Sequence, residues 1–460
     1  MAAPVLLGLP FLQPIMGGMG MGNMITNSAP RQKVAVPVSQ TQVPPVSVTK
    51  LHYVPPNAGV ASSAWTSSGT FLDFELPKSF NVINKTTLQL EINVDSLIPV
   101  TNCPPSPFLI QQIEVYVGSQ LVETLYPNDI YNEMIGFLKI DDMLSQSPSL
   151  AYNPGKVIDD TLTNALVPAE VSATSAPANI AHTTSLKTGL NYIYLPFNNC
   201  LTTCGFNCGG LVEAVKYRVY FPSSMFAAGA AALQTANLVL EEYVGTSADR
   251  RAWEIASNAG TVFSTLVRQR MNTVIQKQGA SDYTLELTGL NGSSAGFMIY
   301  AGPPVNAGSG NTDFVPFTDA SGNQTATANN ILASTRYVID NLTLQDQVGN
   351  KRTELLRGEH LLNFVWPRHI GSSFNARPES QTYLLPFCVN FRDALETGVY
   401  QGHLRTNGRD RLVIGGTPHN AAMTTDNWSF TVTNYAYTGL VVKNGRLVEI
   451  LRNPHAGDYF

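Results

Sequence analysis

Charged residues are scarce in this chain of 460 residues. Asp, Glu, Lys and Arg make up 13% of it, about half of the roughly 25% in an average soluble protein. A solvated monomer needs charge over most of its surface, whereas a subunit that covers its flanks with neighbours does not. The net charge of −5 draws no nucleic acid to the body of the protein. We expect an assembling subunit whose body binds no specific nucleic acid; the alternative is a secreted β-protein rich in Ser, Thr and Asn.

Cysteine is also rare. Five cysteines form no disulfide framework, and the odd number leaves at least one free thiol in a monomer. We therefore expect assembly in a reducing cytoplasm. The apolar stretch 5–16 is too short for a membrane span, contains Pro10 and Pro14, and lacks the basic residues that open a signal peptide. Neither secretion nor a bilayer crossing is indicated.

Motifs that carry catalysis are missing. The sequence contains no GxSxG elbow, no phosphate-cradling GxxxxGK[ST], and no GxGxxG after a strand. No HxH, HExxH or His-carboxylate spacing of a catalytic metal site occurs among the seven histidines, which are His52, His182, His360, His369, His403, His419 and His455. We expect no enzymatic activity, no catalytic residue, no cofactor and no metal site.

One cysteine cluster is the exception to weigh. Cys200, Cys204 and Cys208 are spaced by four residues, which would place three thiols on one helical face. Gly205 and the pair 209–210 argue against that helix. A structural zinc site takes four ligands and shorter Cys-x₂-Cys knuckles, and no fourth ligand is evident. Metal binding and a disulfide remain open, and small packing residues are the favoured interpretation.

Three groups of arginines lie at 250–251, 268–270 and 405–411. Aromatic residues are not interleaved with them, as a groove for single-stranded nucleic acid requires. Salt bridges between subunits or a solvated rim are the default interpretation.

The first 45 residues are predicted to be an arm rather than a domain. Residues 4–25 are apolar and rich in Gly and Met, without strand or helix periodicity, and prolines are scattered over 30–56. Arg31, Lys33 and Lys50 all precede the first acidic residue, Asp73. An apolar tip followed by cations suits an anionic bilayer or a partner's groove. An arm that laces neighbouring subunits together is the alternative.

From about residue 46 the pattern is β. Asn-Gly pairs at 291–292, 407–408 and 444–445 suit type I′ turns, and residues 441–450 read as a hairpin. One helix is predicted, from Pro127 to Leu138. The predicted strands are rich in β-branched and aromatic residues, and many alternate: 87–94, 113–118, 191–197, 216–222, 283–289, 296–302 and 429–437.

The chain contains a weak internal repeat. Val117-Gly118 aligns with Val348-Gly349, an offset of 348 − 117 = 231, which also pairs Glu123 with Glu354, Leu125 with Leu356 and Asn132 with Asn363. Each copy reads as a strand, a Val-Gly turn, a return strand and a short apolar segment. IYLPF (193–197) matches YLLPF (383–387), and a late strand ending at Tyr243 matches one ending at Tyr435. Two tandem copies of one β-domain explain this order, with a long external loop in the first.

Several passages carry a likeness to a known family. They are 83–94, 108–125, 236–254 and 382–416, in which a proline-flanked strand leads through a short helical turn into a final strand pair. With the repeat and the arm, the chain resembles the double jelly-roll major capsid proteins. These form the coats of tailless phages of the tectivirus and corticovirus type, large eukaryotic DNA viruses and virophages, and include adenovirus hexon. Its unusually apolar first 25 residues differ from the coats of the large eukaryotic viruses.

The resemblance implies an all-β fold with two tandem jelly-roll β-sandwich domains, an extended N-terminal arm and a few short helices. The expected divisions are an arm at 1–45, a first jelly roll at 46–250 with a long loop at 139–190, and a second at 251–460 with a C-terminal hairpin. Residues 139–190 and 303–335 are expected to be surface loops.

The implied function is structural. The resemblance predicts homotrimers of pseudo-hexagonal outline that tile an icosahedral virus shell, assemble in the host cytoplasm, and contact other capsid trimers, penton and minor capsid proteins. The arm at 1–45 would lie on the inner face, toward a membrane or neighbouring proteins. The alternatives are a minor capsid or spike protein, and a two-domain β-sandwich protein that binds carbohydrate.

Overall fold

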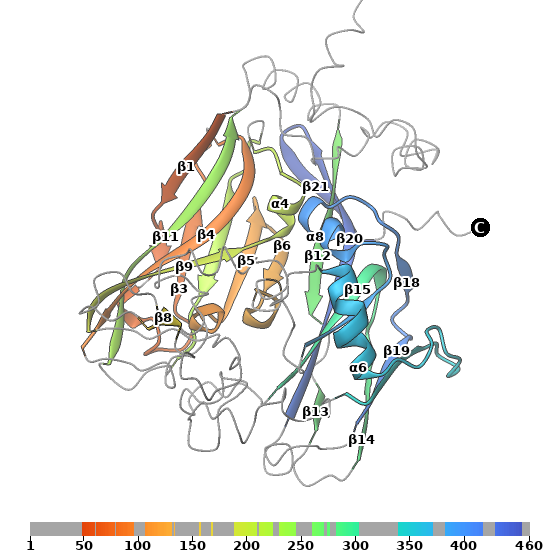
Figure 1. Cartoon of the computed structure of the whole chain (residues 1–460). Helices are drawn as coiled ribbons and strands as arrows, with labels where there is room; N and C mark the ends of the chain where they lie inside the picture. The colour runs from red at the N-terminus through yellow and green to blue at the C-terminus, as the bar shows by residue number, and fades with distance from the viewer. Residues whose placement is uncertain are drawn as a thin grey trace, which may run out of the picture.

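The fold is known from a computed structural model of the chain (Figure 1). The description covers residues 48–59, 61–78, 80–95, 106–130, 133, 156–157, 167–168, 188–208, 211–223, 230–244, 260–270, 274–276, 282–302, 339–370, 382–416 and 428–452. The predicted arm at 1–45, the loop 303–335 and most of the loop 139–190 lie outside these residues. None of the helices so described is both long and apolar enough to cross a membrane.

Two antiparallel sheets form the first half of the molecule. One has the order β1-β11-β4-β9, from β1 (Val48–Val54), β11 (Ala231–Val244), β4 (Val82–Val94) and β9 (Gly189–Phe197). The other has the order β2-β3-β10-β5-β6, from β2 (Ala58–Gly59), β3 (Phe71–Glu75), β10 (Val215–Tyr220), β5 (Gln112–Val117) and β6 (Gln120–Leu125). Burial alternates along β4 and β5, so each strand turns one face to the core between the sheets.

The second half repeats this architecture. Its larger sheet has the path β12-β20-β15-β17, from β12 (Thr261–Arg270), β20 (Trp428–Lys443), β15 (Gly292–Gly302) and β17 (Thr382–Pro386). Three strands extend that sheet: β13 (Val274–Gln276), β18 (Leu404–Thr406) and β21 (Arg446–Leu451). The opposite sheet is β14-β19-β16, from β14 (Tyr283–Leu287), β19 (Arg411–Gly416) and β16 (Asn341–Gln345).

The remaining elements are short. Strands β7 (Lys156–Val157) and β8 (Val167–Pro168) pair with each other. The helical turns are η3 (Ala61–Ser63), η5 (Ser106–Leu109), α4 (Cys200–Thr203), α6 (Gly358–His360), the π-helical η7 (Leu361–Val365), α7 (Trp366–His369) and α8 (Phe391–Thr397). The last two, α7 and α8, lie on the outer face of the second large sheet, where Trp366, Phe391 and Leu395 pack on Met298, Leu384 and Tyr435. Leu361 and Val365 of η7 instead join the core of the second roll.

The two halves share one topology. In chain order, β1, β3, β4, β5, β9, β10 and β11 occupy the same sheet positions as β12, β14, β15, β16, β17, β19 and β20. Residues 351–356 return beside β16, through bridges Leu342↔Leu356 and Gln345↔Lys351, as β6 returns beside β5. Eight strands in two sheets with this crossed order form a jelly roll. The predicted all-β fold of two tandem jelly rolls is confirmed, and we call the halves the first and second rolls.

The segments that carry the repeat occupy equivalent places in the two rolls. The alignment of individual residues between them is wrong in two places. Val117 ends β5 and is buried, whereas Val348 lies in a longer turn and is exposed. The alignment of these two valines is therefore wrong, although Gly118 and Gly349 both have positive φ. The second hairpin is longer by two residues, since 13 residues lie between the paired Leu342 and Leu356 and 11 lie between the paired Ile113 and Leu125, so the offset of 231 holds only after the turn.

The late strand also extends beyond its predicted end. The strand β20 does not end near Tyr435 but continues to Lys443, and the hairpin 441–450 is its far end paired with β21. Through the matching rows of paired residues, Tyr435 is equivalent to Val239 and not to Tyr243. One long apolar strand thus serves both the second roll and the terminal hairpin.

The predicted helix and turns are partly confirmed. Residues 127–130 and 133 are helical, and the rest of the predicted helix 127–138 lies outside the described residues. At 444–445 both residues have positive φ, 52° and 68°, as a type I′ turn requires. Asn291 and Asn407 do not adopt positive φ, so type I′ turns at those two dipeptides are wrong. The Asp410 N–H donates to the Asn407 carbonyl instead.

Two Asn-Gly dipeptides provide a matched test of the terminal turn. Replacing Gly445, at φ 68°, with alanine should lower the free energy of unfolding by about 1–2 kcal/mol, because a Cβ clashes with the following carbonyl in left-handed backbone. Gly408 has no atoms within 4 Å of a built Cβ, so Gly408→Ala should leave stability unchanged. Urea unfolding of both variants measures the difference, and equal losses would contradict the assignment.

Candidate functional site

The site is the junction of the two rolls. The first roll contributes β6, the helix that begins at Pro127, and α4; the second contributes β12 and β20. Figure 1 shows β6 and α4 beside β12, between the two sandwiches. Edge strand β12 therefore meets the flank of the other roll, which covers backbone groups that an edge leaves unpaired.

A buried arginine lies at the centre of the junction. Arg268 of β12 is 3% exposed, and its Nη1 donates to Glu123 of β6 at 3.0 Å. Its Nη2 donates to Glu133 at 2.8 Å, and its Nε bonds the other oxygen of that carboxylate. The Arg268 backbone N–H also donates to Glu123, at 2.8 Å. Tyr435 of β20 completes the cluster by donating its hydroxyl to Glu133 at 2.9 Å.

The cluster holds more negative than positive charge. Asp129 accepts a hydrogen bond from the Thr433 hydroxyl at 2.5 Å, so three buried carboxylates surround Arg268. Burial raises the pKa of Asp129, and it raises the pKa of Glu133 by more than the charge of Arg268 lowers it. Burial alone lowers the pKa of Arg268, and the charges of Glu133 and Glu123 outweigh it, so that pKa lies well above its usual value. The arginine stays charged, and Asp129 is the carboxyl best placed to hold a proton.

Backbone and apolar contacts join the rolls around this cluster. The Thr265 hydroxyl of β12 donates to the Cys200 carbonyl of α4 at 2.6 Å, and the Cys200 N–H donates to Glu123 at 2.6 Å. Phe206 packs on Phe263 with ring centroids 4.8 Å apart. The core of the first roll even includes side chains of the second: Phe263, Val267, Leu440, Val442 and Leu447.

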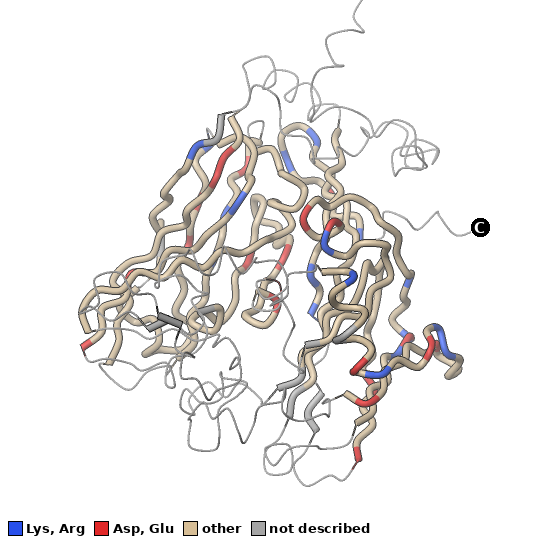
Figure 2. The backbone as a smooth tube through the Cα atoms, in the orientation of Figure 1, with Lys and Arg blue, Asp and Glu red and all other residues tan. Residues whose placement is uncertain are grey.

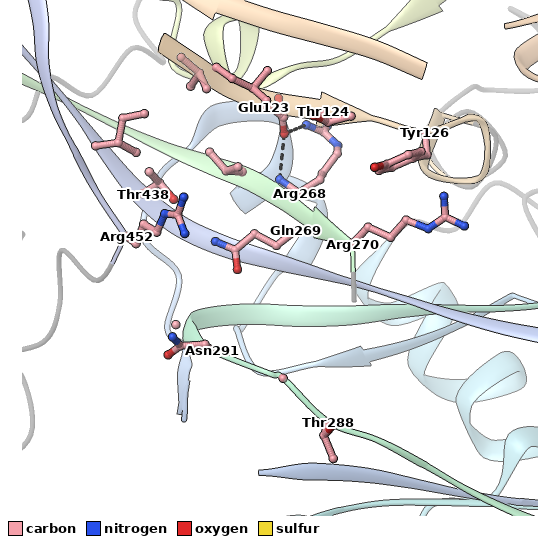
Figure 3. A pocket seen from close by; sticks show the side chains of 16 residues that line it. Glu123, Thr124, Tyr126, Arg268, Gln269, Arg270, Thr288, Asn291, Thr438 and Arg452 are labelled. Atoms are coloured by element: carbon pink, nitrogen blue, oxygen red, sulfur yellow. Dashed lines mark hydrogen bonds and ion pairs between the residues drawn. The ribbon is translucent and has the colours of Figure 1, made fainter. Parts of the chain in front are cut away.

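A polar cleft of about 580 Å³ opens beside the cluster. Figure 3 shows Arg270, Gln269, Arg452 and Asn291 around it. Glu123 is the sole acid among the described residues that line the cleft, and it is already bonded to Arg268 and to α4. The lining thus provides no pair of acids for general acid–base catalysis.

The cysteine cluster is part of the first core. Cys200, Cys204 and Cys208 are buried and free, and burial raises the pKa of each thiol. The described residues contain no group of three or more His, Cys, Asp or Glu able to hold a metal. Absence of a metal site remains a prediction, and the packing interpretation agrees with this burial.

One helix through all three cysteines does not form, as the glycines predict, although a short helix begins at Cys200. Helix α4 forms over Cys200–Thr203 because the Asn199 side chain accepts from the N–H groups of Leu201 and Thr202. Gly205, at φ 51°, ends the helix rather than preventing it. Cys208 lies beyond this end, so the three thiols do not share one helical face.

The arginine groups have different environments. The pair at 250–251 lies outside the described residues. Arg411 forms an ion pair with the exposed Glu286 at 3.1 Å, which agrees with the interpretation as a solvated rim. Arg268 is the exception, because its partners lie inside the same chain and are buried. The sequence marks Glu123 only as a member of the repeat and gives no sign of Asp129 or Glu133 as its neighbours; the one available signal of a buried charge is an acid inside the apolar strand LVETL.

The sandwich topology and the junction define a double jelly roll. No family model matches the sequence, and neither does any curated protein. Among solved structures, VP54 of the virus PBCV-1, fitted into a reconstruction of the virophage Sputnik, matches with a TM-score of 0.60 and 13% identity over 88% of this chain and 98% of its own. The Faustovirus major capsid protein matches with a TM-score of 0.56 and 9% identity over 91% and 94%. These likenesses show that the chain has the fold of both proteins.

Removing the central cation should destabilise the protein strongly. Arg268→Met leaves Glu123 and Glu133 buried without a counter-charge, which costs about 3–5 kcal/mol. Glu286→Gln is the control, since it breaks the exposed pair with Arg411 at a cost below about 1 kcal/mol. Urea unfolding measures both, and similar small losses would show that the cluster contributes little.

Asp129→Asn should change how stability depends on pH. The raised pKa of Asp129 means that the folded state keeps this proton at pH values where the unfolded chain, with a pKa of about 3.9, has lost it. The contribution of the protonated Asp129 to the free energy of unfolding is complete below the unfolded pKa and falls as the pH rises toward the folded pKa. Asparagine has no such proton, so the variant should gain stability relative to the native chain as the pH rises above about 4. Urea titrations across this range test the sign, and a constant difference would exclude a protonated Asp129.

Proposed function

We propose that this protein is the structural major capsid protein of a tailless icosahedral virus. The observation that carries the proposal is the tandem pair of jelly rolls, which matches VP54 and the Faustovirus major capsid protein over nearly their whole lengths. Single jelly rolls serve many functions, so the fold alone is a weak guide. Two rolls locked edge to flank in one chain form a broad building block with two similar halves.

Surface chemistry supports the same function. Figure 2 shows long uncharged stretches along the strands of both rolls, with scattered charged residues and one denser group of both signs near β19. Several large apolar side chains are nevertheless exposed, among them Leu51, Tyr53 and Phe364. Exposed apolar groups on a surface poor in charge favour contact with other proteins.

The proposal includes a homotrimer of pseudo-hexagonal outline that contacts other capsid trimers, penton and minor capsid proteins. Its location is the virion, after assembly in the host cytoplasm; the four described cysteines, all free, agree with a reducing compartment. It has no enzymatic activity or cofactor, and its body binds no specific nucleic acid. The arm 1–45, with its apolar tip and the cations Arg31 and Lys33, contacts an internal membrane or neighbouring proteins.

We also propose the domain limits 1–45, 46–250 and 251–460. Strand β1 begins at Val48, β11 ends at Val244, and β12 begins at Thr261, which agrees with a division between the rolls near residue 250. Residues 139–190 and 303–335 are assigned as surface loops, where sequence varies at low cost to the fold.

Size-exclusion chromatography with light scattering tests the function. The expected result is a stable particle of three times the 49.8 kDa chain mass, which forms shells in electron micrographs when it is concentrated. A monomer that binds glycans would overturn the proposal in favour of a carbohydrate-binding protein.

A further inference from the structure

The shared topology makes residues of the two rolls equivalent. In the first roll, one row across the large sheet pairs Pro196 with Thr87, Thr87 with Val239, and Val239 with Tyr53. In the second, the corresponding row pairs Pro386 with Gly296, Gly296 with Tyr435, and Tyr435 with Arg268. The two prolines belong to the LPF matches that anchor both rows. Tyr53 on edge strand β1 is therefore the counterpart of Arg268 on edge strand β12.

The opposite side of the junction also has a counterpart. The helices after the two hairpins begin at Pro127 and Gly358. Seven residues into each lie Glu133 and Phe364. By the same offset, Thr124 of β6 corresponds to Leu355.

These equivalent surfaces differ in exposure. Arg268 and Glu133 are 3% and 4% exposed because the two rolls meet there. Their counterparts Tyr53 and Phe364 are 60% and 54% exposed. In Figure 1, β1 lies at one side of the molecule, and the helix containing α6 lies in the other roll, away from it. Each subunit thus has one completed junction, between its own rolls. It also has the two surfaces of a second junction, around Tyr53 and around Phe364, which do not meet within the subunit.

We infer that a second copy of this chain completes the open junction. The β1 edge of one subunit, with Leu51 and Tyr53, packs against residues 351–364 of the next subunit, with Leu355 and Phe364. Tyr53 contacts Phe364 at the position where Arg268 bonds Glu133 within a subunit. This inference rests on the proposed assembly and names the surfaces that build it.

Symmetry and chemistry both favour this contact. A head-to-tail contact between different surfaces closes into a ring when its rotation divides a full turn, and three two-roll chains give six similar junctions. The exchange of an ion pair for an aromatic pair suits the intermolecular position. Separate subunits would have to desolvate opposite charges on meeting, whereas two exposed rings gain by burial.

A charge exchange tests the contact. Tyr53→Arg and Phe364→Glu should each raise the concentration at which trimers dissociate by about tenfold or more, because each buries a charge that has no opposite charge across the contact. The double variant restores the arrangement of Arg268 and Glu133 and should recover most of the native affinity. Val448→Glu, at an exposed apolar position on the terminal hairpin, is the control and should leave the trimer unchanged.

The outcomes separate the two proposals. Both test positions are exposed, so far-UV circular dichroism of the variants should match the native chain. If the single variants form native-strength trimers, or if the double variant fails to recover, the contact is wrong while the trimer stands. If the native chain itself remains a monomer, the proposed function fails and the contact with it.

Discussion

A buried guanidinium fixes how the two rolls meet. Arg268 has been removed from water, so every displacement that separates it from Glu123 or Glu133 leaves unpaired charge in a medium of low polarity. Glu123 adds a further restraint, because the same carboxylate accepts the N–H of Cys200 at the start of α4. One acid thereby ties β6, α4 and β12 together. The rolls cannot slide along each other without breaking several of these bonds at once.

Much of the fold was predictable because its signals are local. Alternation marks a half-buried strand within six or eight residues, and burial alternates in this way along β4, β5 and β14. The repeat could be read for the same reason, since matching hairpins and LPF motifs lie within short windows. Register could not. It depends on which residues pair across the sheet, and both the longer turn at 346–350 and the continuation of β20 to Lys443 become visible only when strands are paired.

The junction was out of reach for a different reason. Glu123 and Arg268 are 145 positions apart, and Glu133 and Arg268 are 135 apart, so no spacing in the sequence relates them. Arg268 follows a run of β-branched and apolar residues, where an arginine reads equally well as the exposed end of a strand. The repeat does not predict a buried arginine either, because the position in the first roll that is equivalent to Arg268 holds Tyr53. Equivalent places in the two rolls keep their geometry while their chemistry changes.

The long strand β20 contributes side chains to the cores of both rolls. Its first half lies in the core of the second roll, through Phe430 and Val432, while Leu440 and Val442 near its end belong to the core of the first. A fragment that stops near residue 250 would therefore lack part of its own interior, which residues 440–447 supply. The interior of the first roll is complete only when residues 440–447 pack into it, so the two rolls share one core although their topology is that of two.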